Sequence, residues 1–172
     1  MSPPSGDHVV NAPQPTFTNE QVVTAIRTAF SPRWDTSLSR EDAAARATIY
    51  RANLAHYRRH VQRSLDERDY LQVAEKSWGA FTQIVKAIGA DHQIKLSSHV
   101  GIYRVAGELA SLVGQMDPYA ENMLNDTATL VSGLHTHFYE GNLTDAMVIQ
   151  SAAAVGDGID LLQEYFPPPT EG

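Results

Sequence analysis

The sequence predicts an all-α fold, an up-and-down bundle of five to six helices. Several segments carry apolar residues at every third or fourth position, which is the period of a helix with one buried face. Serine, threonine or aspartate precedes these segments, and glycine or proline follows several of them, as at helix ends. No segment alternates between apolar and polar residues as a half-buried strand does. We expect one helical-bundle domain over residues 18–166.

Residues 1–17 and 167–172 are expected to be tails outside this domain. The N-terminal tail contains four prolines together with glycine, serine and asparagine, a composition that favours disorder. The short C-terminal tail begins with three consecutive prolines, which cannot continue a helix.

Local signals place the individual helices. Thr18, with Gln21 three residues later, is a capping box, and Ser39 followed by acidic residues is a second helix start. Gly89 and Gly141 are expected to end the third and fifth helices. The expected helices cover about residues 19–30, 39–68, 71–88, 98–113, 118–139 and 145–166.

The third expected helix has the clearest apolar stripe in the chain. Its members are Ala74, Trp78, Phe81, Val85 and Ile88. Because Gly79 follows Trp78, we expect this helix to pack closely against another helix. In the last expected helix, Gly156 and Gly158 are expected to weaken the middle.

Charge is unevenly distributed along this acidic chain. The net charge is −7, yet seven of the 13 basic residues lie between Arg40 and Arg68. No lysine or arginine follows Arg104, whereas ten acidic residues do. The second helix is therefore basic and the C-terminal third is acidic, so the helix could bind an anion or pair with acidic residues of another subunit. A protein that coats nucleic acid uniformly would have a basic isoelectric point, and this chain does not.

The composition also indicates where in the cell the protein is expected. The absence of cysteine excludes disulfides, thiolate metal sites and a cysteine nucleophile. No apolar run approaches the roughly 18 residues that span a bilayer. The first 15 residues lack the basic start and apolar centre of a secretory signal. We expect a cytoplasmic protein that does not bind membranes.

The basic helix supplies the candidate anion-binding residues, which are Arg51, His56, Arg58, Arg59 and Arg63. At about 100° per residue, His56, Arg59 and Arg63 lie opposite the apolar stripe, and the other two flank it. Guanidinium groups bind phosphate through paired hydrogen bonds, so this row could bind a nucleotide or RNA. The alternatives are a solvated helix face, or arginines paired with acidic residues of another helix or subunit.

Other residues favour packing over chemistry. His56 and His60 are four residues apart but lack a third metal ligand, and on a helix His135 and His137 point about 200° apart. We therefore predict no metal or cofactor, and we predict that His135 and His137 cap or pack. Four aromatic residues could stack on bases, namely Trp78, Phe81, Phe138 and Tyr139. The helical spacing of Trp78 and Phe81 favours core packing for these two. The chain has no Gly-x-Ser-x-Gly turn and no glycine-rich phosphate loop.

Two motifs carry a resemblance to a known family. The first is Gln-x-Ala-Glu-Lys-x-Trp-Gly-Ala at residues 72–80, and the second is Leu-His-x-x-Phe-Tyr-Glu at residues 134–140. Over about residues 43–166 the chain resembles the archaeal PaREP family of small helical proteins, relatives of the HEPN helical-bundle superfamily. The resemblance implies an archaeal protein, a homodimer and a non-catalytic binding or assembly role. It also allows a partnership with a small nucleotidyltransferase, as in some relatives.

The HEPN superfamily also includes ribonuclease toxins, which have an Arg-x(4–6)-His motif followed by tyrosine. Aligning Tyr139 with that tyrosine places His137 at the histidine and Ser132 near the arginine, and serine cannot stabilise a phosphate charge. This departure argues against ribonuclease activity. The alternative is a metal-independent ribonuclease that uses His137 or His135 beside Tyr139. The literal Arg-x4-His at residues 51–56 lies on another helix, so we interpret it as coincidence or as a relocated site at a dimer interface.

Overall fold

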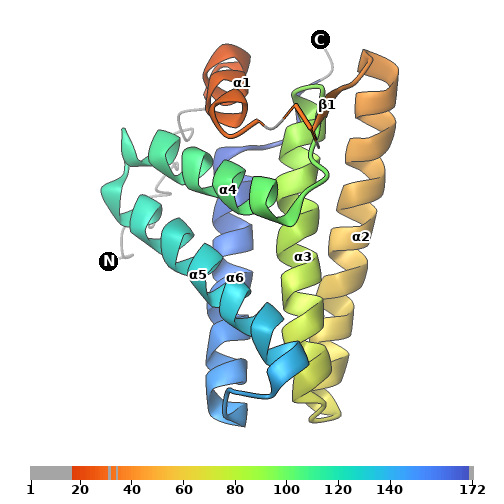
Figure 1. Ribbon diagram of the computed structural model, residues 1–172, viewed down its shortest axis with the longest axis vertical. Coiled ribbons are helices and arrows are strands. Elements are labelled where there is room, and N and C mark those ends of the chain that lie inside the picture. Colours follow the sequence, from red (N-terminus) through yellow and green to blue (C-terminus); the bar gives the residue numbers. More distant parts are fainter. Residues whose placement is uncertain (1–16, 31, 34, 171–172) are drawn as a thin grey trace, which may run out of the picture.

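The computed structural model describes residues 17–30, 32–33 and 35–170 (Figure 1). These residues form six helices and one pair of two-residue strands, which confirms the all-α prediction. Almost all of the predicted N-terminal tail lies outside the described residues. The elements are α1 (Asn19–Thr28), β1 (Thr36–Ser37), α2 (Arg40–Asp66), α3 (Tyr70–Asp91), β2 (Ile94–Lys95), α4 (His99–Gly114), α5 (Pro118–Glu140) and α6 (Asp145–Tyr165).

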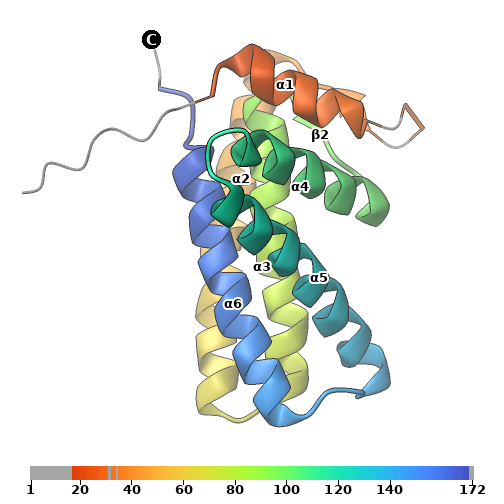
Figure 2. The same ribbon diagram turned by 90° about the vertical axis from the view of Figure 1, so that its left-hand side faces the viewer.

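Four helices form the up-and-down bundle. In Figure 1, α2 and α5 run downward, whereas α3 and α6 run upward, with α5 inclined to the others. Helices α1 and α4 lie across the upper end of the bundle (Figure 2). Helix α3 is central, because it packs against α2, α5 and α6. Its predicted stripe is confirmed in the core, where Ala74, Phe81, Val85 and Ile88 are buried and Trp78 is half-buried.

The predicted helix starts are confirmed by capping hydrogen bonds. The side chain of each cap accepts the backbone N–H three residues later. These caps are Thr18, Ser39, Ser98, Asp117 and Thr144. At the C-terminal end of α5, Gly141 has a left-handed backbone with φ of 61°, as predicted for a terminating glycine.

The prediction that Gly89 ends its helix is wrong, because α3 continues to Asp91. A Cβ on Gly89 would lie 3.0 Å from the carbonyl oxygen of Ile94 in β2. This glycine therefore allows a close approach of the chain after α3 and does not act as a cap. The strand pair was also not predicted. It joins Thr36 with Lys95 and Ser37 with Ile94, and two residues are too few for any alternating pattern.

The two glycines of α6 have different surroundings. At Gly158, a Cβ would overlap the buried side chain of Thr127 on α5, so the absence of a side chain lets the two helices approach. At Gly156, a Cβ would meet no atom within 4 Å. Helix packing therefore explains the glycine at position 158, but not the glycine at position 156.

A hydrogen bond links the end of α6 to the start of α5. The Tyr165 hydroxyl donates to Oδ2 of Asp117 at 2.9 Å, while Oδ1 of Asp117 accepts the amides of Tyr119 and Ala120. Burial, together with the hydrogen bond to the Asp117 carboxylate, raises the pKa of Tyr165 to about 12.

This pKa shift makes the stability pH-dependent. An unfolded tyrosine ionises near pH 10, so the stabilising effect is complete below about pH 10 and is lost as the pH rises toward 12. We expect Tyr165→Phe to lower the free energy of unfolding by about 1 kcal/mol at pH 7, and this difference to shrink above pH 10. Urea unfolding at pH 7, 9 and 10.5 measures it. The control is Tyr119→Phe, because Tyr119 is exposed. A difference in unfolding free energy between wild type and Tyr165→Phe that stays constant with pH would contradict the prediction.

No helix within the described ranges combines the length and apolar character needed to cross a bilayer.

Candidate anion-binding site

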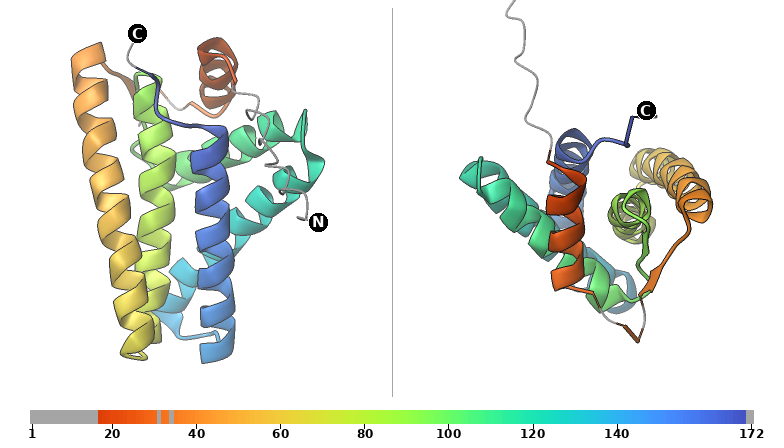
Figure 3. Two further views of the ribbon diagram at one scale, coloured as in Figure 1. Left: turned by 180° about the vertical axis from the view of Figure 1, so that it is seen from behind. Right: turned by 90° about the horizontal axis from the view of Figure 1, so that it is seen from above.

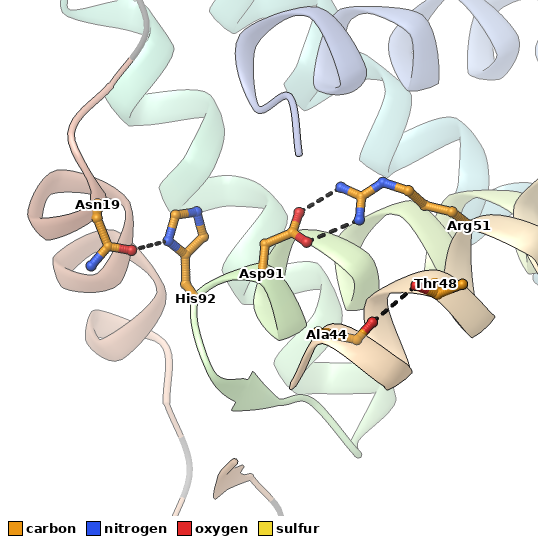
Figure 4. Close-up of polar contacts among 6 residues, drawn as sticks. All are labelled: Asn19, Ala44, Thr48, Arg51, Asp91 and His92. Atoms are coloured by element: carbon orange, nitrogen blue, oxygen red, sulfur yellow. Dashed lines mark hydrogen bonds and ion pairs between the residues drawn. The ribbon is translucent and has the colours of Figure 1, made fainter. Parts of the chain in front are cut away.

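Arg51 is held inside the protein by Asp91. The two guanidinium nitrogens donate to the two carboxylate oxygens at 2.9 and 2.5 Å, in the paired geometry that arginine and carboxylate favour (Figure 4). The side chains are 24% and 6% exposed. This ion pair links the middle of α2 to the end of α3, so Arg51 is already paired and does not belong to a free anion-binding row.

Arg58 is paired as well. Its guanidinium donates to Asp160 on α6 at 2.6 Å, and both side chains are largely exposed. The basic helix therefore contacts the acidic C-terminal third at this point. For Arg51 and Arg58, the structure favours the alternative of pairing with acidic residues of another helix.

The other three predicted residues lie on the exposed face of α2. His56, Arg59 and Arg63 are all exposed, and the two arginines form no ion pair with any described residue. The structure brings two further basic side chains to them. His60 contacts the His56 ring with centroids 4.3 Å apart, and Lys76 of α3 lies 5.8 Å from the Tyr57 ring centroid. We call His56, Arg59, His60, Arg63 and Lys76 the cationic strip.

The charges of this strip act on His60. Its pKa is lowered by burial first, and then by the positive charges of His56, Arg63, Lys76 and Arg59. Lys76 also pairs with Glu75 at 2.6 Å, so its charge is partly balanced. Because four neighbours disfavour a further positive charge here, the strip is a place where an anion would be stabilised.

The two motifs that carry the family resemblance, residues 72–80 and 134–140, contact each other in a cluster of aromatic and histidine rings apart from the cationic strip. Trp78 of α3 stacks on His135 of α5, with centroids 4.4 Å apart and planes 19° apart. His99 of α4 contacts both rings edge-on, at 5.0 and 5.7 Å, and Tyr139 contacts His135 at 5.3 Å. This confirms a packing role for His135. His99 could not be predicted for this cluster, since it comes from a different helix.

Three polar atoms in this cluster and on the adjacent Tyr103 are buried and have no hydrogen-bond partner among the described residues. They are Nε1 of Trp78, Oη of Tyr103 and Nδ1 of His135. Burial, and then the nearby His99, lower the pKa of His135, so its ring is neutral at neutral pH. Burial raises the pKa of Tyr103, partly offset by the adjacent Trp78 side chain. Both ionisable side chains are therefore uncharged around pH 7.

His137 has a structural role. The ring is buried, and its Nδ1 accepts the backbone N–H of Leu143 at 2.9 Å, which fixes the chain after α5. This confirms the predicted capping role. Among the described residues, no hydrogen bond or ion pair joins His137 to an arginine. Ser132, which lies near the arginine position of the ribonuclease motif, is exposed. Within the described ranges, no group of three or more histidine or acidic side chains could hold a metal ion.

Comparisons with protein-family models, curated proteins and solved structures give no match to this chain. The PaREP and HEPN resemblance therefore stays a prediction. The same holds for the homodimer, the nucleotidyltransferase partner and the cytoplasmic location that were predicted with it.

Proposed function

We propose that this protein is a non-catalytic binding module that holds the phosphates of RNA or a nucleotide on the cationic strip. The observation that carries this proposal is the exposure of Arg59 and Arg63 on one helix face, with no carboxylate partner among the residues that the structure describes. Unpaired guanidinium groups keep their donors available for phosphate oxygens.

The surrounding charges support a localised site. The chain carries a net charge of −7, so its overall charge opposes a polyanion, whereas the strip is a local concentration of positive charge. His60 adds a side chain that gains positive charge as the pH falls. Burial first, and then repulsion by neighbouring positive charges, lower the pKa of His60, and a bound phosphate would offset that repulsion.

Binding of fluorescein-labelled single-stranded RNA, measured by anisotropy at 50 and 200 mM salt, tests the proposal. Wild-type affinity should fall with salt, because bound cations are released when protein groups neutralise phosphates. In Arg59→Gln/Arg63→Gln, the slope of log affinity against log salt should shrink by about 1.4, since each phosphate contact contributes about 0.7 for single strands.

The matched control is Arg46→Gln/Arg104→Gln, which removes the same charge outside the strip. It should retain most of the wild-type slope. Equal losses in the two double variants would mean that only the net charge matters, and salt-independent binding would exclude phosphate contacts. Either result would overturn the proposal.

The ribonuclease alternative has less support, because His137 is buried and its Nδ1 already accepts a backbone N–H. Incubating RNA with the wild type and with His137→Ala separates the alternatives. Cleavage by the wild type that disappears in the variant would favour the enzyme.

A further inference from the structure

A cavity of about 710 Å³ lies where α2 begins and α3 ends. One wall is the first part of α2, the floor is the end of α3, and the opposite wall is the chain after α6. In Figure 3 that chain runs from α6 toward the upper ends of α2 and α3. The apolar lining consists of Ala43, Ala44, Ala47, Ala90, Pro168 and Pro169.

Small side chains explain why this space is open. The alanines of α2 end at Cβ, so the helix leaves room between itself and the C-terminal segment. Pro168 and Pro169 have a restricted φ and no backbone N–H, which makes them a stiff wall without unpaired donors. The volume falls within the range of about 300–1,000 Å³ that is typical of small-molecule sites.

The charged lining indicates the ligand class. At the inner end, Asp91 is neutralised by Arg51, and its side chain is only 6% exposed. Arg40 also lines the cavity and forms no ion pair with any residue in the described ranges. Among the described lining residues, two positive charges and one negative charge leave an excess of one positive charge. Gln93 and Thr170 add polar groups at the lining.

We infer that this cavity binds a small organic anion, with its apolar body against the alanines and prolines and its charged group on Arg40. The site is separate from the cationic strip. Arg40 and Arg59 are 19 residues apart on one helix, roughly 28 Å at 1.5 Å per residue. The inference does not depend on RNA binding.

The test uses two fluorescent probes of similar shape. 8-Anilinonaphthalene-1-sulfonate is an apolar anion, and N-phenyl-1-naphthylamine is its neutral counterpart. We expect one sulfonate probe to bind per chain, and to bind more tightly than the neutral one. Arg40→Gln should weaken the sulfonate probe about tenfold, since it removes a charge-assisted hydrogen bond, and should leave the neutral probe unchanged.

Paired variants locate the probe. Ala44→Phe should weaken both probes because the new ring fills the cavity, whereas Ala45→Phe should not, since Ala45 is also exposed but does not line the cavity. Arg59→Gln should leave both probes unaffected. Equal affinities in Ala44→Phe and Ala45→Phe, or loss of the sulfonate probe in Arg59→Gln alone, would overturn the inference. So would the absence of binding at millimolar probe. None of these results would alter the RNA measurement, which concerns the other end of α2.

Discussion

Replacing Gly158 by alanine is expected to lower the free energy of unfolding by about 2 kcal/mol. The added Cβ would lie within 2.7 Å of the Thr127 Cβ, closer than packed carbon atoms allow. Thr127 is 2% exposed, so its side chain has no space into which to move. Overpacking of this kind typically costs about 1–3 kcal/mol. Urea unfolding followed by circular dichroism measures the change.

The neighbouring glycine is the control for helix propensity. Gly156→Ala meets no atom within 4 Å and should stabilise the protein by up to about 1 kcal/mol, because alanine favours the helix. The two substitutions are chemically identical and two residues apart, yet opposite signs are expected. A stabilised Gly158→Ala would show that α5 and α6 do not approach as closely as described.

Arg51→Met should be the most damaging change in the basic helix. It leaves the Asp91 carboxylate, 6% exposed, without its guanidinium partner. Removing one member of a buried ion pair costs about 3–5 kcal/mol. Because Arg51 is 24% exposed and water can reach the site, we expect about 2–3 kcal/mol, measured by urea unfolding.

Two companion variants separate this effect from a general loss of charge. Arg58→Met breaks an exposed pair, 40% and 60% exposed, and should cost less than about 1 kcal/mol. Arg51→Met/Asp91→Leu should recover most of the lost stability, since no unpaired charge remains. RNA affinity should be unchanged in folded Arg51→Met. If Arg51→Met lowered the RNA affinity without changing the free energy of unfolding, Arg51 would be an anion-binding residue after all.

Much of the fold could be predicted because helix signals are local. A cap such as Ser39 and a stripe such as that of α3 depend on residues within a few turns. The role of Gly89 could not be predicted in this way. Glycine is needed at this position because the carbonyl of Ile94 lies close to Gly89, and the two come together only after the chain has turned back.

In the candidate site, too, features within one helix could be predicted and contacts between helices could not. Helical geometry alone placed Arg59 and Arg63 on the outer face, because both belong to one helix. Arg51 and Arg58 flank the apolar stripe, and flanking positions face the neighbouring helices. Their partners, Asp91 and Asp160, are 40 and 102 residues away, so no spacing in the sequence reveals them.

The short strand pair has a consequence for how the chain opens. Beside it, the amide of Leu38 donates to the carbonyl of Gln93 at 2.8 Å, and the amide of Ser97 donates to the Asp35 carboxylate. At the far end, only residues 67–69 separate α2 from α3. The helical hairpin is thus fastened at both extremities. Fraying that begins at the strand end must first break these hydrogen bonds, and the short connection holds the helices together at the other end, so we expect α2 and α3 to open together as one cooperative unit.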